Sequence, residues 1–428
     1  MNQSKTMSAA APATTAAAVG WQVWVPCIGM ALCSWLSFVD RQVLNILAPT
    51  IIKDTGLTNQ DFTAATSFFF LTYTLGNPVW GSVIDYIGLR KGMLLAVAVW
   101  TAASMSHSWM GSFAGFALAR AVLGIGEGGT FPGGLRTAVE TLPPVKRARG
   151  IALSFSGGTI GAVMMPLLLG PLAISYGWRN AFLATGALGI VWMVIWAAIA
   201  RPPFLPATSA RPHKAMWPNF RERRVWALIF SYALPAISPG PVLTILALYL
   251  GQGLGMTQAQ VNSVVWVPPL TWGIGYFFWG WAADKFAATN TRPIGLFLLL
   301  TVASLTLGFA TWTTSPVIAI ALISFSTFIG GGFQMVALKA GSFAFPREQS
   351  AMMTGIASGS WSLVNFLLLN AIGAGLTIGG VRVFPGFNWM NTQSWGEIFW
   401  LIAVLPAVGI GLWMALNAST SKDETATG

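Results

Sequence analysis

Long apolar stretches recur along the chain, each close to the length of a membrane-spanning helix. Such a helix needs roughly 20 apolar residues to cross a hydrocarbon core of about 30 Å. Six stretches precede a polar gap and six follow it. We predict helices at about 22–47, 63–84, 92–110, 112–134, 148–170, 180–200, 225–250, 258–283, 293–313, 315–337, 350–376 and 395–417. The pattern therefore indicates an all-α membrane protein, with twelve transmembrane helices in two six-helix bundles.

The same pattern divides the chain into regions. The expected order is a disordered cytoplasmic tail (1–20), an N-terminal six-helix bundle (21–200), a basic cytoplasmic linker (201–224), a C-terminal six-helix bundle (225–417) and a second cytoplasmic tail (418–428). The first tail is rich in Ala, Ser and Thr and lacks the pattern of a cleaved signal peptide. The polar end after Asn417 is expected to be a tail of the same kind.

The composition excludes a water-soluble domain. Hydrophobic residues make up 55% of the chain and charged residues only 8%, whereas soluble domains are roughly one quarter charged. The cysteines are Cys27 and Cys33, and the histidines are His107 and His213. They are too few for a disulfide framework or a zinc cluster. We therefore expect neither a metal nor a cofactor.

The formal net charge of +11 follows from where the basic residues stand. If both termini are cytoplasmic, nearly all Lys and Arg outside the helices face the cytoplasm, many of them in the gap 201–224. Lys53, Arg179 and Arg382 face the other side. This is the positive-inside pattern of membrane proteins. It predicts a multi-pass protein of the inner (cytoplasmic) membrane with both termini cytoplasmic, and it explains the charge without any nucleic-acid partner.

A short motif occurs at the same place in both halves. Gly81 and Asp85 end the second predicted helix, and Gly280 and Asp284 end the eighth with the same spacing. A glycine lets two helix ends approach closely, and an aspartate can accept hydrogen bonds from a helix N-terminus or pair with loop arginines. A helix cap is the simpler interpretation of one such motif. Its repetition beside a basic loop in each half favours a functional role.

With this motif the chain resembles the major facilitator superfamily, whose loop between helices 2 and 3 reads G-x-x-x-D-[RK]-x-G-[RK]-[RK]. Here Gly81, Asp85, Gly88, Arg90 and Lys91 match it, while Tyr86 and Leu89 replace two basic residues. The resemblance implies the major facilitator fold. It also implies a cytoplasmic gate that locks while the transporter faces outward, formed by Gly81, Asp85, Gly88, Arg90, Lys91, Gly280, Asp284 and Lys285.

Charged residues inside the predicted helices are Asp40 and Arg41 in the first, and Arg120 and Glu127 in the fourth. Charges are costly within a membrane and usually mark a substrate or proton pathway. Arg120 and Glu127 lie two turns apart on one helical face, so we expect them to neutralise one another inside a cavity. The alternative is that buried ion pairs only fix the helix register.

The surrounding sequences resemble the anion:cation symporter family. Ser37-Phe-Val-Asp40-Arg41 resembles N-Y-x-D-R, and Arg120-Ala-Val-Leu-Gly-Ile-Gly-Glu127 resembles R-x-x-L-G-x-x-E. Gly177-Trp-Arg-Asn-Ala-Phe182 matches G-W-R-x-x-F before helix 6. This family includes bacterial hexuronate, aldonate and aldarate permeases. The chain departs from the N-Y-x-D-R motif of this family at Ser37 and Phe38. They replace Asn and Tyr and so remove two polar groups near Asp40.

Roles follow from this resemblance and from the chemistry of the side chains. Arg41 can form paired hydrogen bonds with a substrate carboxylate. Asp40 and Glu127 are candidate proton carriers, because burial favours the neutral carboxyl and a nearby arginine favours the anion. Arg120 is expected to exchange partners between them as the cavity fills.

Uncharged substrate contacts are expected mainly from the C-terminal half. In the resembling family, a Ser/Thr-Trp pair on helix 11 and a Tyr on helix 2 face the polyol. The candidates here are Tyr73, Gln334, Ser358, Ser360, Trp361, Asn365 and Asn370. The alternative for each is a structural contact between helices. Two further GxxxG pairs, Gly157/Gly161 and Gly355/Gly359, are interpreted as close helix crossings.

These observations predict a proton-coupled symporter, functional as a monomer in the lipid bilayer, that imports a hydroxylated organic anion such as a hexuronate, galactonate or glucarate. A drug or metabolite:proton antiporter would share the fold, but it favours an apolar, acid-lined cavity over one that carries an arginine. A membrane-embedded enzyme is the remote alternative. It would need a nucleophile, a base and an orienting group, and the predicted helices contain neither a histidine in their interior nor a Gly-x-Ser-x-Gly motif.

Overall fold

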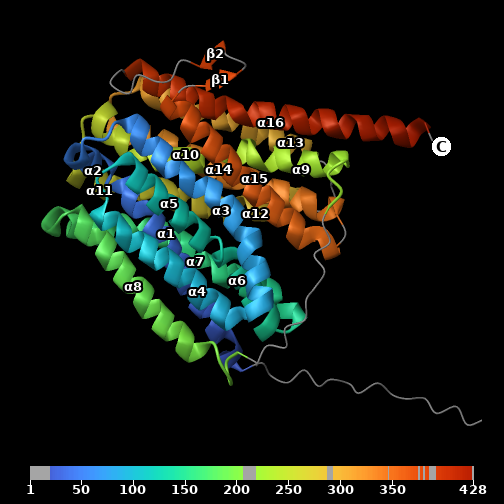
Figure 1. Cartoon of the computed structure of the whole chain (residues 1–428). Coiled ribbons are helices and arrows are strands. Elements are labelled where there is room, and N and C mark those ends of the chain that lie inside the picture. Colours follow the sequence, from blue (N-terminus) through green and yellow to red (C-terminus); the bar gives the residue numbers. More distant parts are fainter. Residues whose placement is uncertain are drawn as a thin grey trace, which may run out of the picture.

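The computed structural model describes residues 20–205, 218–286, 293–345, 347–374, 376–378, 381–384 and 392–426. It is built almost entirely of helices (Figure 1). The predicted N-terminal tail (residues 1–19) and the centre of the basic linker (206–217) lie outside the described residues. Within the described part, the helices group into twelve segments that coincide with the twelve predicted stretches.

The N-terminal half contains the first six segments. They are α1 (Val25–Ile46), α3 (Asn59–Ile87), α4 (Leu89–Ser106), α5 with α6 (Phe113–Glu127 and Thr130–Thr141), α7 (Pro144–Tyr176) and α8 (Trp178–Ile199). Three short helices accompany them, η1 (Trp21–Trp24), α2 (Ala48–Thr55) and η2 (His107–Trp109). The fourth segment is divided at Gly128 and Gly129, between α5 and α6.

The C-terminal half contains the other six. They are α9 (Arg223–Ala233) with η3 (Pro235–Ile237), α10 (Pro239–Leu248) and η4 (Tyr249–Gly253); α11 (Gln258–Val264) with α12 (Val267–Phe286); α13 (Ile294–Ser304) with η5 (Leu305–Trp312); α14 (Pro316–Ala344); α15 (Arg347–Ala374); and α16 (Thr392–Ala426). By length and composition alone, seven helical stretches in the described part qualify as membrane spans. The fourth segment does not qualify, because neither α5 nor α6 reaches 18 residues.

Two features differ from the sequence prediction. A short antiparallel pair, β1 (Leu376–Ile378) and β2 (Val381–Phe384), stands between α15 and α16, so the fold is not helical throughout. In addition, α16 continues to Ala426, so residues 418–426 are helical rather than a disordered tail. Neither Pro nor Gly occurs between Gly411 and Gly428, and nothing in the sequence therefore interrupts the helix.

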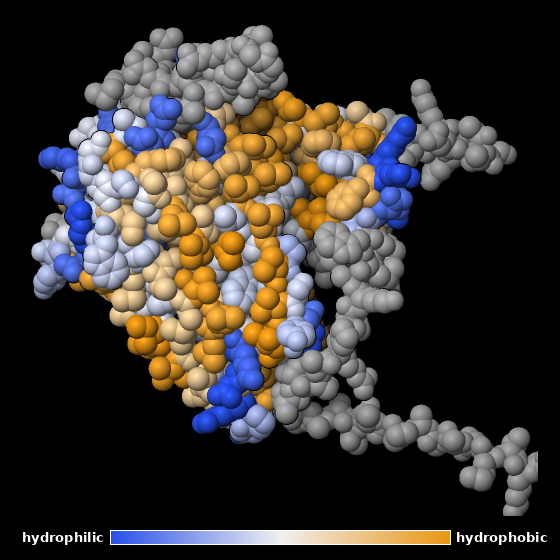
Figure 2. All heavy atoms as spheres, in the orientation of Figure 1, coloured by the Kyte–Doolittle hydropathy of each residue, from blue (hydrophilic) through white to orange (hydrophobic). Residues whose placement is uncertain are grey.

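The outer surface is apolar over a broad zone, as shown for one face in Figure 2. Large side chains such as Leu118, Val194, Val302 and Val317 are more than half exposed there or on other faces. Exposed apolar surface on this scale would be a liability in water, whereas lipid solvates it. The large interior side chains, among them Trp100 and Trp196, are instead fully buried between helices.

One of the two GxxxG pairs, Gly157/Gly161, forms the close helix crossing that the sequence predicts. A Cβ atom on Gly157 would overlap the carbonyl oxygen of Ala31, and one on Gly161 would lie 2.5 Å from the carbonyl oxygen of Trp35. This pair therefore lets α1 and α7 touch through their backbones. The prediction for Gly355 and Gly359 was wrong, because a Cβ on Gly355 would meet open space and one on Gly359 only an ordinary contact at 3.6 Å.

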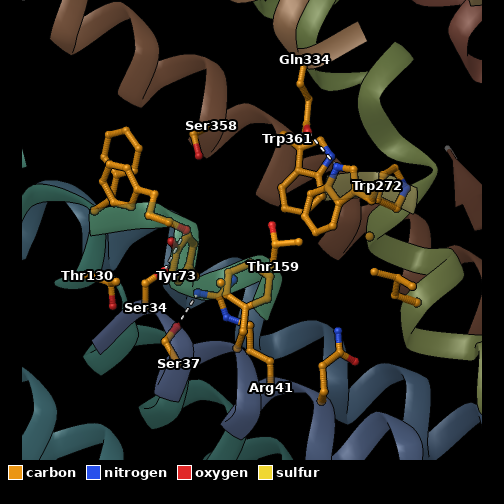
Figure 3. Close-up of a pocket in the computed structure, with 18 of the residues that line it drawn as sticks. Ser34, Ser37, Arg41, Tyr73, Thr130, Thr159, Trp272, Gln334, Ser358 and Trp361 are labelled. Atoms are coloured by element: carbon orange, nitrogen blue, oxygen red, sulfur yellow. Dashed lines mark hydrogen bonds between the residues drawn. The ribbon is translucent and has the colours of Figure 1, made fainter. Parts of the chain in front are cut away.

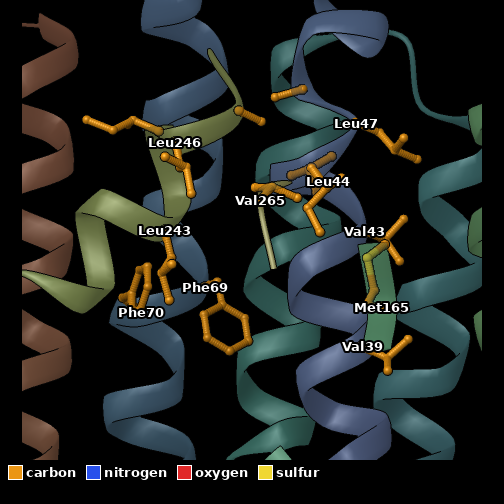
Figure 4. Packing of buried hydrophobic residues seen from close by; sticks show 14 of the residues in the cluster. Val39, Val43, Leu44, Leu47, Phe69, Phe70, Met165, Leu243, Leu246 and Val265 are labelled. Carbon is orange, nitrogen blue, oxygen red and sulfur yellow. The ribbon is translucent and has the colours of Figure 1, made fainter. Parts of the chain in front are cut away.

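The two halves meet at one face of the molecule and diverge at the other (Figure 1). We call the end where α3 gives way to α4 the terminal face, and the end where α1 leads into α2 the opposite face. Near the opposite face the halves share an apolar cluster, which contains Leu44 of α1 and Phe69 of α3 from one half and Leu243 and Leu246 of α10 from the other (Figure 4). The helix ends of the two halves separate at the terminal face.

Hydrogen bonds between uncharged side chains join the halves above this cluster. The amides of Asn59 and Gln252 bond to each other twice, at 2.5 and 3.1 Å. Gln258 accepts from Thr50 at 2.9 Å and donates to the carbonyl oxygen of Ile46 at 3.0 Å. We call Thr50, Asn59, Gln252 and Gln258 the opposite-face latch.

Candidate functional site

A cavity of about 660 Å³ lies between the two halves. Its lining comes from α1, α3, α5, α6 and α7 on one side and from α9, α10, α12, α14 and α15 on the other (Figure 3). A volume of this size suits a small molecule. Both halves therefore contribute to one central site. Any movement of one half relative to the other changes the shape of this site.

A charged pair forms the N-terminal wall of the cavity. The Nε of Arg41 lies 2.5 Å from Oε2 of Glu127, and this oxygen also accepts a hydrogen bond of 2.8 Å from the Ser37 hydroxyl. Arg41 donates a further bond of 3.1 Å to Ser37. The side chain of Glu127 is fully buried, whereas that of Arg41 is 17% exposed. Of this pair, the Arg41 guanidinium is therefore the member that lines the cavity.

Aromatic rings surround this guanidinium on several sides. Its central carbon lies 4.8 Å from the ring centre of Phe38, 4.9 Å from Phe69 and 4.7 Å from Tyr73. Cation–π contacts stabilise a cation without neutralising it. The rings thus hold Arg41 in place while leaving it able to bind an anion. Tyr73, predicted from the sequence, also lines the cavity.

The expected pair of Arg120 and Glu127 is not formed. The two residues share a helix face but lie two turns apart, a rise of about 10.5 Å, and Arg41 of the crossing helix reaches Glu127 instead. Arg120 is 1% exposed and donates to the carbonyl oxygen of Arg41 at 3.2 Å. Buried Nε of Arg120 and Oε1 of Glu127 have no partner among the described residues.

Asp40 faces away from the cavity, although it precedes Arg41 directly. It accepts a hydrogen bond of 2.7 Å from Ser104 on α4, and Ser104 lies 3.0 Å from the hydroxyl of Thr185 on α8. Successive residues on a helix point about 100° apart, so only one of the two can face the centre. The two buried carboxyl groups of this half therefore have different surroundings.

The C-terminal wall is aromatic and amide-bearing. The indole nitrogen of Trp272 donates to Oε1 of Gln334 at 3.1 Å, and the Tyr276 hydroxyl donates to the same oxygen. Trp361 donates to the carbonyl oxygen of Ala236 at 2.7 Å and presents its ring to the cavity. Ser358 lines the cavity beside it. Gln334, Ser358 and Trp361 were predicted from the sequence.

The other predicted polar contacts of this half lie outside the cavity lining. Ser360 donates to the carbonyl oxygen of Ala357, Asn365 to that of Trp361, and Asn370 to the hydroxyl of Ser67 at 2.6 Å. These contacts are structural. Sequence reasoning missed other lining residues, namely Ser34, Gln42, Asn45, Thr130, Thr159, Tyr232, Thr244, Trp272 and Tyr276. The one-turn spacing of Trp272 and Tyr276 places both side chains on the same helix face. This spacing could have identified them as a pair in the sequence.

The repeated motif lies at the terminal face. Asp85 pairs with Arg136 at 3.1 Å, and Arg136 also pairs with Glu140 at 2.5 Å. Arg90 donates to the carbonyl oxygen of Ala197 at 3.0 Å, and Lys91 is exposed. The side chain of Asp284 lies outside the described part of the chain.

The glycines of the motif do not mark close approaches in this conformation, contrary to expectation. A Cβ on Gly81 would make an ordinary contact at 3.9 Å, and one on Gly280 would meet nothing within 4 Å. The divergence of the halves at this face explains the open space. Gly88 is different, since its φ of 86° requires glycine at the turn from α3 into α4. Lys285 lies over the rings of Trp281 and Phe286.

Comparison with known proteins shows which family has this architecture. Residues 30–369 match the Major Facilitator Superfamily. The chain belongs to the major facilitator superfamily. It is therefore a multi-pass membrane transporter and not an enzyme. The two bundles around one central cavity are the fold of this superfamily.

The relatives include transporters of hexuronate and galactonate. The chain is 22% identical to the hexuronate transporter of Escherichia coli, over 92% of this chain and 94% of the relative. It is 24% identical to the D-galactonate transporter of another Escherichia coli strain, over 75% and 81%. These relatives confirm the resemblance to the anion:cation symporters.

A solved structure matches the fold. It is a bacterial homologue of the human lysosomal transporter Spinster, in an inward-facing and unoccupied conformation. The match has a TM-score of 0.75 at 18% identity, and covers 94% of this chain and 98% of the other.

Proposed function

We propose that this transporter is a proton-coupled symporter that imports a hydroxylated organic anion, such as a hexuronate or a sugar acid like galactonate or glucarate, by alternating access. The observation that carries the proposal is the pair of Arg41 and Glu127 on the cavity wall. Arg41 supplies a partly exposed guanidinium, and the buried carboxylate of Glu127 pairs with it. The hexuronate and galactonate transporters among the relatives support the substrate class.

The pair couples anion binding to proton binding. A substrate carboxylate that reaches Arg41 competes with Glu127 for the same guanidinium. If Glu127 were ionised when it lost Arg41 as its partner, it would be an unpaired buried charge, which is strongly unfavourable. Protonation of Glu127 removes that penalty. One carboxylate therefore enters as one proton is taken up, and the net charge of the site stays the same.

Asp40 and Arg120 form a second buried layer behind this pair. Asp40 is held by Ser104, which also contacts Thr185, and is 2% exposed. Arg120 bonds to the backbone of Arg41 and has a free buried Nε among the described residues. In the proposal, Asp40 is a second proton carrier and Arg120 changes partner as Glu127 loses its charge.

Alternating access requires the latch to open when the terminal face closes. In the proposal the terminal face is cytoplasmic, both termini are cytoplasmic and the membrane is the inner membrane, because the terminal face carries Arg90, Lys91 and Lys285. The structure then corresponds to an inward-facing state. The residues Gly81, Asp85, Gly88, Arg90, Lys91, Gly280, Asp284 and Lys285 are proposed as the gate of that face. One chain contains both walls of the cavity, so the proposed working unit in the lipid bilayer is a monomer.

Asn59→Ala is expected to shift the protein toward the state open at the opposite face. It removes two amide hydrogen bonds between the halves, each worth about 1 kcal/mol or less, which is enough to change a two-state population several-fold. A cysteine at Ala152, a cavity residue, reports the shift through faster labelling by an impermeant thiol reagent from that face. Asn180→Ala is the control, since Asn180 bonds within its own half. Equal labelling in both variants would contradict the latch role.

The function is tested by uptake into proteoliposomes. The panel contains galactonate, glucuronate, galacturonate, glucarate and neutral hexoses. With a pH gradient of about one unit, acidic outside, a one-proton symporter accumulates its substrate up to about tenfold. A protonophore should abolish accumulation, and the neutral hexoses should not accumulate. Uptake of an acid that is independent of the pH gradient would refute proton symport. Export of a cationic compound in exchange for protons would indicate the antiporter.

A further inference from the structure

The amide of Gln334 is held in one orientation by two donors from α12. Trp272 and Tyr276 lie one helical turn apart, and both donate to Oε1 of Gln334. An indole N–H can only donate, so the atom it contacts must be the amide oxygen. Trp272, Tyr276 and Gln334 all line the cavity, where Gln334 approaches Trp361 (Figure 3).

This arrangement leaves the amide nitrogen for a ligand. Both lone pairs of the Gln334 oxygen are used, and its Nε2 has no hydrogen-bond partner among the described residues. The residue as a whole is only 3% exposed, but it lines the cavity and its nitrogen is not among the fully buried atoms without a partner. The nitrogen is therefore accessible from the cavity. It is available to donate to an acceptor oxygen of the molecule that fills the cavity.

The part of the surrounding wall that the structure describes carries no ionised side chain. Among the described lining residues contributed by α9 to α15, the polar groups are those of Gln334, Ser358, Thr244 and the aromatic side chains Tyr232, Tyr276, Trp272 and Trp361. The arginines of the lining, Arg41 and Arg120, are both in the N-terminal half. A hydroxyl group can accept from Gln334 without any charge to compensate. A second carboxylate there would be buried without a cation.

We propose that Gln334, positioned by Trp272 and Tyr276, is the hydrogen-bond donor for the uncharged, hydroxylated end of the substrate. The carboxylate at the other end binds Arg41. The transporter therefore selects monocarboxylic sugar acids over dicarboxylic ones. This inference rests on the proposed function and narrows its substrate class.

Wild-type protein in proteoliposomes is compared with three variants at this wall. The probes are whichever of galactonate and glucuronate accumulates faster, and the dicarboxylate glucarate. The wild-type KM for the monocarboxylate should be at least about tenfold below that for glucarate. Gln334→Leu should raise the monocarboxylate KM about tenfold, the effect of a lost buried hydrogen bond, with kcat little changed. Tyr276→Phe, which removes one of the two donors and keeps the ring, should raise it about threefold.

A gain of function separates recognition from a structural role. Gln334→Lys places a cation at the distal wall, and the preference should shift at least about tenfold toward glucarate. Tyr249→Phe is the control, because it removes another buried tyrosine bond, to the carbonyl oxygen of Ala310 at 3.0 Å, outside the cavity lining. Its KM values should match the wild type. Thermal unfolding of each variant establishes that it is folded, and Tyr276→Phe keeps the test open if a Gln334 variant is not.

Two results would overturn the inference. One is a wild-type KM for glucarate equal to or below that for the monocarboxylates. The other is an unchanged monocarboxylate KM in folded Gln334→Leu or Tyr276→Phe. Neither touches the proposed function, which fails separately if the wild-type protein accumulates none of these acids under a pH gradient.

Discussion

Arg41→Lys is expected to raise the Kd of the transported anion by about 30- to 150-fold, equivalent to about 2–3 kcal/mol. Lysine keeps the positive charge but cannot form two parallel hydrogen bonds with a carboxylate. It also loses the planar group that lies 4.7–4.9 Å from the rings of Phe38, Phe69 and Tyr73. Binding of the radiolabelled substrate to purified protein measures the change directly.

Arg179→Lys is the matched control for this substitution. Arg179 also pairs with a carboxylate, Asp54 at 2.5 Å, and also lies over an aromatic ring, that of Trp178 at 4.1 Å. This pair is half exposed and outside the cavity lining, so the control should bind substrate like the wild type. If folded Arg41→Lys retained wild-type affinity, Arg41 would not be the anion anchor.

Glu127→Gln is expected to abolish accumulation driven by a pH gradient while preserving substrate exchange. Glutamine is close in shape to a protonated glutamate but cannot release a proton. The variant should therefore resemble the loaded form of the site, in which Arg41 is free for the substrate carboxylate. Under a gradient of about one pH unit, the expected accumulation of up to about tenfold falls to simple equilibration. Counterflow of labelled substrate, measured without a gradient, should continue and should lose its dependence on external pH.

Glu222→Gln provides the control for the chemical change itself. Glu222 pairs with Arg224 at 2.5 Å at the surface, and neither residue lines the cavity. It should transport like the wild type under both conditions. The opposite pattern for Glu127→Gln, with exchange lost and accumulation retained, would remove Glu127 from the coupling mechanism and leave Asp40 as the remaining candidate.

The architecture could be predicted from the sequence because the membrane imposes it locally. Each span must be apolar over a fixed length and must satisfy its own backbone, and both conditions are visible in the order of residues. The helix segments accordingly coincide with the predicted stretches, and the relatives confirm the family. The cost of charge in the membrane likewise directed attention to Asp40, Arg41, Arg120 and Glu127 without any coordinates.

The hydrogen-bond and ion-pair partners within the site could not be predicted from the sequence in the same way. Spacing along α5 put Arg120 and Glu127 on one face, yet Glu127 bonds to Arg41 of another helix. The same limit applies to Asn365 and Asn370, whose amides bond outside the cavity. A helical pattern states which face a side chain occupies, but not which element lies opposite that face.

The sequence by itself therefore determined that the protein lies in a lipid bilayer, how many helices span it and how the chain divides into halves. It also identified the charged residues whose burial needs a functional explanation. The tertiary structure alone decided which charges are paired and which of Asp40 and Arg41 faces the cavity. It also decided that the Gln334 nitrogen has no hydrogen-bond partner among the described residues. The physical reason is that hydrophobicity and charge are properties of single residues and their neighbours in the chain. Hydrogen-bond pairing instead depends on how helices cross, and residues far apart in the sequence set those crossings, as Gly157 does where α7 meets α1.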